Sequence, residues 1–364
     1  MSSTRPTPSL RAVSGTGGKG PACFLVETPE ARLLLDLGYG PRPGLLPEVG
    51  EVGTVDALLL SHGHRDHAGG LALLPKVGNP RIYATDIVAA RMRPGLVTGS
   101  LPMGAEAEIA GIRVRTGRSG HAPGGVWIHL ALGSGLLYMG DNSSESILYA
   151  CDAPPPAATV IIDASYGADD TALTENQEQF EALFRSGAVL LPVPADGRGP
   201  EIALYLARKG YPTLRIDETT RSSLKRMGNT EGASLRQGAA AELARIADTA
   251  QALDGPHGIM LAARADGTEG EAARLIKQWE NEATPAIVFT GDLTPGTPAE
   301  RLVKSGRARD LLWNVHPRLS DNVALLCAVK ARTVVPAFCG TEHFAALSHA
   351  FAPARVSVDM PIAL

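Results

Sequence analysis

Residues 61–67 constrain the fold more than any other stretch of the chain. They read Ser-His-Gly-His-Arg-Asp-His and follow the apolar segment Val55–Leu60, which we expect to be a buried strand. Three imidazoles and a carboxylate within six residues are nitrogen and oxygen ligands of the kind that zinc binds. The glycine between His62 and His64 lets the two rings converge on one ion. The strand is therefore expected to end in a loop that encloses a metal.

The rest of the chain divides into two parts by its pattern of expected strands and helices. From Ala22 to Asp163, short β-like runs are punctuated by glycine, with only short helices between them, one of them expected at Ser143–Ala150. After Tyr166, strands and helices alternate, which is typical of a parallel α/β domain. A length of 364 residues suits two domains rather than one. We place the domain boundaries, where this pattern changes, near residues 165 and 306.

Composition excludes several classes of protein. Hydrophobic residues make up 44% and charged residues 20% of the chain, as in a folded protein, and a net charge of −4 excludes a generally basic nucleic-acid coat. The four cysteines form no CxxC pair, which favours a reducing compartment. The first twenty residues lack the apolar region of a signal peptide, and no apolar run reaches membrane-spanning length. We therefore expect a cytoplasmic protein that does not enter a membrane.

The histidine cluster and three further motifs resemble the metallo-β-lactamase superfamily. The four motifs of that superfamily occur in order, at Leu35–Gly38, Ser61–His67, Ser119–His121 and Tyr138–Asp141. By this resemblance, one metal takes His62, His64 and His121, the other takes Asp66 and His67, Asp141 bridges the two, and Asp36 is a supporting group. The resemblance implies two zinc ions, with manganese as the alternative.

Later segments resemble the β-CASP branch of that superfamily, which contains nucleases of RNA processing and DNA repair. These segments are Ile162–Gly167, Pro194–Glu201, Gly296–Leu302 and Asn314–His316. The resemblance implies an αββα sandwich formed by residues 1–165 and 306–364. A β-CASP-like parallel α/β domain, residues 166–305, would be inserted into it.

The activity implied is hydrolysis of a phosphodiester in RNA or single-stranded DNA, with RNA favoured and a metal-bound hydroxide as the nucleophile. Asp66 would orient the nucleophile, and His316 and Arg198 would bind the scissile phosphate. Asp163, like Asp36, would be a supporting group. Two alternatives stay open: a small-molecule hydrolase, such as a thioesterase or cyclic phosphodiesterase, and a weakly active RNA-binding subunit. The sequence does not fix the oligomeric state, for which a homodimer is one candidate.

One residue departs from the family pattern. RNA-cleaving members carry a histidine after the strand that follows His316, and this chain has Cys339 at that place. A thiolate can bind zinc, which makes Cys339 a candidate ligand of the second metal. An isolated cysteine is more often a small buried apolar residue, and we favour that alternative.

Positive charge is concentrated in the inserted segment. Between Arg198 and Arg236 there are eight basic and four acidic residues. A basic surface would suit a polynucleotide, because phosphate contacts supply most nucleic-acid affinity. The alternative is an ordinary solvated helix face.

Overall fold

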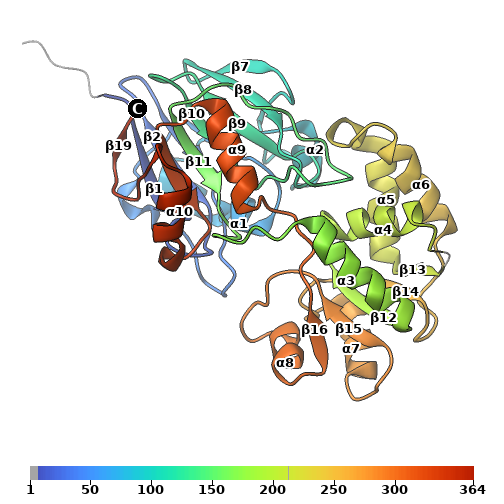
Figure 1. Ribbon diagram of the computed structural model, residues 1–364. Coiled ribbons are helices and arrows are strands. Elements are labelled where there is room, and N and C mark those ends of the chain that lie inside the picture. The colour runs from blue at the N-terminus through green and yellow to red at the C-terminus, as the bar shows by residue number, and fades with distance from the viewer. Residues whose placement is uncertain (1–6, 212) are drawn as a thin grey trace, which may run out of the picture. The chain divides into compact units, whose positions relative to one another are not determined.

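The computed structural model describes residues 7–211 and 213–364, which fold into two compact units (Figure 1). The first, here called the core unit, runs up to Ser144 and continues through Cys151–Asp170 and His316–Leu364. The second, the inserted unit, consists of Glu145–Ala150 and Thr171–Val315.

Two seven-stranded sheets form the centre of the core unit. The first has the order β19 (Ile362–Ala363), β1 (Ser9–Ser14), β2 (Cys23–Glu27), β3 (Arg32–Leu35), β4 (Ala57–Leu59), β5 (Arg81–Ala84) and β6 (Gly99–Ser100). The second has the order β18 (Arg355–Val356), β17 (Thr333–Ala337), β11 (Thr159–Asp163), β10 (Leu136–Tyr138), β9 (Val126–Leu130), β8 (Ile112–Arg118) and β7 (Glu106–Ile109).

Alternation of side chains along each strand explains the layering. In β2, Phe24 and Val26 pack into the core shared by the two sheets, while Cys23 and Leu25 pack on the opposite face. In β11, Ile161 faces the shared core, whereas its neighbours Val160 and Ile162 face the other way. Successive side chains of a strand point to opposite faces, so these strands are buried on both sides and need a helical layer outside each sheet.

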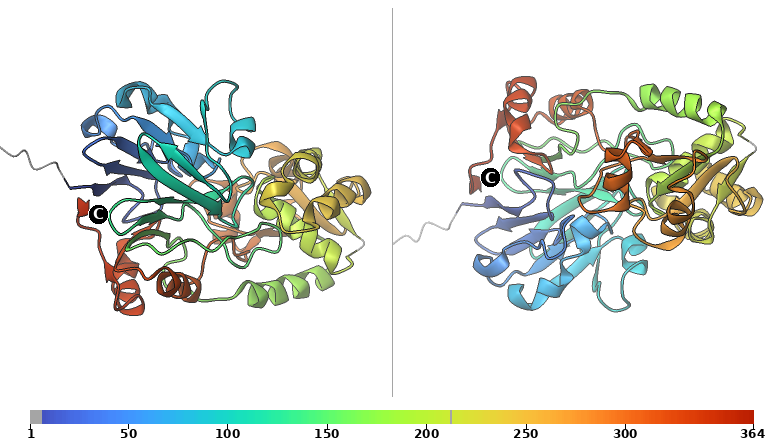
Figure 2. Two further views of the ribbon diagram at one scale, coloured as in Figure 1. Left: turned by 90° about the horizontal axis from the view of Figure 1, so that it is seen from above. Right: turned by 90° about the horizontal axis from the view of Figure 1, so that it is seen from below.

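Helices supply both outer layers. The first sheet is covered near α1 (Arg65–Ala68), α2 (Asp86–Ala90) and the 3-10 helices Val49–Glu51 and Leu71–Val77. The second is covered by α9 (Leu319–Val329) and α10 (Phe344–Ala350), preceded by the 3-10 turn Thr341–His343. In the left view of Figure 2 the blue helices lie on one side of the paired sheets and the red helices on the other. The predicted αββα sandwich is confirmed.

The inserted unit is a parallel α/β domain, as predicted. Its five parallel strands have the order β13 (Leu214–Ile216), β14 (Ile259–Ala263), β12 (Val189–Val193), β15 (Ala286–Phe289) and β16 (Ala308–Asp310). Its helices are α3 (Leu173–Ser186), α4 (Arg198–Arg208), α5 (Glu218–Thr230), α6 (Ala239–Thr249), α7 (Gly270–Trp279) and α8 (Pro298–Lys304), with a 3-10 turn at Gly232–Ser234. The central strand β12 is buried on both faces, with Leu191 in one core and Leu190 in the other.

The inserted unit differs from the expected 166–305 in three places: its main segment begins at Thr171, that segment ends at Val315, and Glu145–Ala150 is added. β16 pairs with β15, so the inserted unit continues to Val315 rather than ending at 305. The short segment Glu145–Ala150 also packs with the inserted unit, and the helix predicted at Ser143–Ala150 is wrong. Its backbone is instead fixed by tertiary contacts: the Ile147 amide donates to the Glu201 carboxylate at 2.7 Å, and Tyr149 forms an isolated bridge with Leu235. Across the described ranges, no helix is both long and apolar enough to cross a membrane.

Candidate metal centre

The candidate ligands of the core unit lie in loops that follow strands of both sheets. His62 and His64 come from the loop after β4, and β8 leads to His121. Asp141 follows β10, with Gly140 at φ 56° between strand and ligand. A Cβ atom at Gly140 would lie 2.8 Å from the side chain of Ser61, so only glycine lets the two loops approach this closely.

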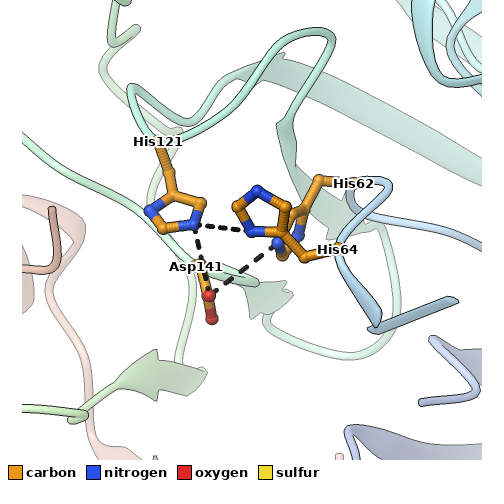
Figure 3. Close-up of side chains that lie close together, drawn as sticks. All are labelled: His62, His64, His121 and Asp141. Carbon is orange, nitrogen blue, oxygen red and sulfur yellow. Dashed lines mark hydrogen bonds and ion pairs between the residues drawn. The ribbon is translucent and has the colours of Figure 1, made fainter. Parts of the chain in front are cut away.

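The first candidate group consists of His62, His64, His121 and Asp141, whose ligand atoms lie within 4.8 Å of one another. Figure 3 shows the rings gathered around the carboxylate. His121 Nε2 lies 3.1 Å from His64 Nδ1 and 3.4 Å from Asp141 Oδ2, and His62 Nε2 lies 3.8 Å from the same oxygen. Three imidazoles and one carboxylate around a common point match the tetrahedral coordination that zinc prefers.

Two further groups share Asp141. Asp66, His67 and Asp141 form one, with His67 Nε2 3.0 Å from Asp141 Oδ1 and 4.0 Å from Asp66 Oδ2. Asp163 and His316 form the other with Asp141. A carboxylate common to neighbouring ligand sets is the arrangement that lets one side chain bridge two cations.

The chemistry of the donors fits a divalent cation. His62 is buried, and its Nε2 has no hydrogen-bond partner among the described residues. Burial, with the nearby rings of His67 and His64, lowers the pKa of His62, so its imidazole stays neutral, which is the form that binds a metal. Burial opposes ionisation of Asp141, but the surrounding histidines, His67 first, hold its pKa well below the usual range. An anionic carboxylate facing the neutral imidazole of His62 indicates a cation site.

Asp36 contacts the imidazole of His67 at Nδ1, the ring nitrogen that does not face Asp141. Its Oδ2 lies 2.8 Å from His67 Nδ1 and accepts from Ser61 Oγ at 2.6 Å and from the Tyr138 hydroxyl at 2.5 Å. Its Oδ1 accepts from the Ser61 amide at 2.7 Å. A carboxylate on the far ring nitrogen fixes the tautomer and orientation of a metal-binding histidine. The sequence did not reveal the roles of Ser61 and Tyr138, although both residues belong to motifs that it singled out.

His316 is positioned by a second buried carboxylate. Its Nδ1 lies 2.8 Å from Asp163 Oδ2 and 3.9 Å from Asp141 Oδ2. The Asp163 side chain also accepts from the amides of Asn142 at 3.2 Å and Ser165 at 3.0 Å. These contacts leave Nε2 of His316 as the ring nitrogen that can face a substrate.

Cys339 lies outside these groups. None of the candidate ligand groups found in residues 7–211 and 213–364 contains it. Its side chain packs with Leu137 and Ile162 in the core between the second sheet and its helices. Burial, then the carboxylates of Glu342 and Asp163, raises the pKa of Cys339 to about 12, which favours the protonated thiol. The neighbouring Phe338, at φ 65°, lies beside His67 instead, with ring centroids 5.1 Å apart.

Arg198 belongs to the inserted unit and stands in the first turn of α4, where its guanidinium lies against Gly291.

Other basic residues of the segment Arg198–Arg236 have partners inside the same unit. Arg226 pairs with Asp196 at 2.8 Å, and Arg221 donates to the carbonyl of Ala250 at 2.9 Å. Further pairs join Arg208 to Glu242, Lys209 to Glu181 and Arg215 to Asp254. A phosphate bound by these side chains would compete with these contacts.

Known proteins resemble this chain in sequence and in fold. The sequence profile of the metallo-beta-lactamase superfamily matches residues 16–191. A transcription termination factor FttA of Cenarchaeum symbiosum is 27% identical over 56% of this chain and 39% of its own length. An RNase J-like protein of Methanocaldococcus jannaschii is 30% identical over 51% of each chain. The chain thus spans about two fifths to one half of these relatives.

A solved structure of a protein of unknown function from Enterococcus faecalis covers 99% of this chain, with a TM-score of 0.60 and 12% identity. It supports the fold alone. The profile match, the two curated relatives and the four motifs in their predicted order agree on one family. The match over residues 16–191 and the two relatives show that this chain is similar to the metallo-β-lactamase superfamily and resembles its β-CASP branch.

Proposed function

We propose that this protein is a zinc-dependent phosphodiester hydrolase that cleaves RNA or single-stranded DNA. The observation that carries the proposal is the set of three overlapping ligand groups centred on Asp141. His62, His64, His121 and Asp141 would hold one zinc ion, and Asp66, His67 and Asp141 the second. When bound, two such cations polarise water and stabilise negative charge on phosphoryl oxygens.

The chain's own residues orient this chemistry. Asp36 holds His67 in the tautomer that presents Nε2 to a metal. Asp66, half exposed beside His67, is suited to accept a proton from the attacking water and so orient it. Cys339 is assigned no role as a ligand, because it packs in the core as a thiol.

His316 is assigned to the leaving group. Its Nδ1 donates to Asp163, so the remaining proton position is Nε2. A protonated Nε2 can hold a phosphoryl oxygen or protonate the departing oxygen, as a general acid does. The buried Asp163 holds the ring in the orientation that this role requires.

The names of the relatives favour RNA over DNA, since one is described as RNase J-like and another as a transcription termination factor. The test is turnover by the metal-loaded chain of single-stranded RNA, single-stranded DNA, a thioester and a nucleoside cyclic phosphate. Oligonucleotide cleavage that is lost in His316→Ala with its zinc retained is expected. Turnover of the thioester or the cyclic phosphate alone would replace the proposal with a small-molecule hydrolase.

A further inference from the structure

Arg65, between the ligand residues His64 and Asp66, lacks the carboxylate partner that several other arginines of the core unit have. Arg118, Arg318 and Arg32 are paired with carboxylates at 2.6, 2.9 and 2.9 Å. The guanidinium of Arg65 is exposed, and within the described part of the chain it has no ion-pair or hydrogen-bond partner. Its charge is therefore available to a ligand.

The side chain is nevertheless held in place. Its Cζ lies 4.0 Å from the centroid of the Tyr39 ring, a cation–π contact. The Tyr39 amide donates to the Arg65 carbonyl at 2.9 Å, and the Tyr39 hydroxyl accepts from the amide of Gly44. Ring and guanidinium thus form a fixed pair, which we call the Arg65–Tyr39 stack.

Gly69 makes room for the stack. A Cβ atom there would lie 2.8 Å from Tyr39 Cβ, 2.9 Å from Arg65 Cγ and 2.4 Å from the Arg65 carbonyl oxygen. The same two loops are joined further along, where the Leu37 amide donates to the His67 carbonyl at 2.9 Å. The stack is therefore attached to the loops that carry the Asp36–His67 pair.

The geometry defines what such a group can bind. A guanidinium with one face on an aromatic ring keeps its N–H edges free, and these edges match two oxygens of a phosphate. Resting on Tyr39, it loses less conformational entropy on binding than a freely rotating arginine does. Arg65 is adjacent in sequence to two candidate metal ligands, so its backbone lies beside the metal centre, and a phosphate bound to its side chain would lie next to that centre rather than on it.

We propose that Arg65 binds a non-scissile phosphate next to the cleaved bond and so positions a polynucleotide for hydrolysis. This inference rests on the proposed phosphodiesterase function. It makes Arg65 a positioning residue that distinguishes a chain of phosphates from a small phosphodiester.

The test compares two substrates of the metal-loaded full-length chain: a single-stranded RNA oligonucleotide and bis(p-nitrophenyl) phosphate, which has no neighbouring phosphate. In Arg65→Ala we expect KM for the oligonucleotide to rise about tenfold, which is about 1.4 kcal/mol. The ratio of the two kcat/KM values should fall by a similar factor. The slope of log kcat/KM against log salt should become shallower by about 0.7, as for one lost phosphate contact. Arg65→Lys should restore the slope but not the whole of KM.

Arg113 supplies the matched control. It is an exposed arginine without a described partner on β8, and lies about 16 Å along the strand from its end at Arg118. Arg113→Ala should leave KM and the salt slope unchanged. Equal values for Arg65→Ala and wild type, or an equal loss in Arg113→Ala, would overturn the assignment. If neither substrate is hydrolysed, the proposed function fails, and fluorescence anisotropy with the uncleaved oligonucleotide then applies the same salt-slope criterion to Arg65.

Discussion

Replacing Asp36 with asparagine tests how the proposed second metal position, the one that contains His67, is built. The two side chains have nearly the same shape, but one carboxylate oxygen becomes an NH2 group. If the NH2 group faces Ser61, it meets the backbone amide that now donates at 2.7 Å and cannot rotate away. If it takes the other position, it meets His67 Nδ1, and the imidazole must shift its proton to Nε2 in order to accept. That proton would occupy the nitrogen that faces Asp141.

Either orientation should weaken metal binding at the position that contains His67. Loss of such a supporting group typically costs 10- to 100-fold in metal affinity, or about 1.4–2.7 kcal/mol. A buried donor left without a partner adds a stability loss of about 1–3 kcal/mol. Zinc titration of the metal-free protein against a competing chelator measures the first quantity, and urea unfolding measures the second.

Asp56→Asn is the matched control, since Asp56 is an exposed carboxylate that accepts only a surface contact, from the Arg32 amide at 2.8 Å. It should bind zinc like the wild type. Wild-type zinc affinity at both positions in Asp36→Asn would refute the reasoning, because the carboxylate would then not be orienting His67.

Three further predictions follow from the described contacts. Asp141→Ala should remove both zinc ions and all hydrolysis, while the circular dichroism spectrum stays unchanged. His64→Ala should lose only one zinc ion. Full activity with normal zinc content in either variant would contradict the ligand assignment. Cys339→Ala should cost about 1–2 kcal/mol in urea unfolding through a small cavity and leave zinc binding intact, and a tenfold loss of affinity at one position would instead identify a sulfur ligand. Burial raises the pKa of the Glu201 carboxyl to about 7. The folded chain therefore binds the carboxyl proton more tightly than the unfolded chain does. The free energy of unfolding should fall as pH rises from about 4.5 to about 7. Glu201→Gln should reduce that fall, measured as the difference in urea midpoint between pH 5 and pH 8, and an identical pH dependence in both proteins would show that the buried carboxyl is not its source.

Local spacing carried most of what the sequence could predict about the site. His62, His64, Asp66 and His67 lie within one loop and one turn, so their order alone indicates a metal. The role of Tyr138 could not be read in the same way, because it depends on a contact with Asp36 that spans 102 residues. Such a contact exists only after both sheets have formed.

The errors have a similar origin. Ser143–Ala150 has a helix-like pattern, but Glu201 and Leu235 give its backbone other partners. The count of charges between Arg198 and Arg236 also left out the acidic partners of these basic residues. Those partners, Glu181, Glu242 and Asp254, lie outside the range that was counted. Tertiary pairing decided both cases, and local sequence does not record it.

The pairing of β11 with β17 has a consequence for synthesis on the ribosome. These adjacent parallel strands are separated along the chain by nearly the whole inserted unit, and β1 finds its partner β19 only among the final residues. The strands of the inserted unit all lie between Val189 and Asp310, so that unit can complete its sheet while the second sheet of the core unit still lacks β17. Domains tend to fold as they emerge, and β11, whose five residues are all buried in the finished protein, must wait with one edge unpaired. Nascent chains of this protein are therefore most exposed to aggregation after the metal-binding loops have been made and before Thr333 has emerged.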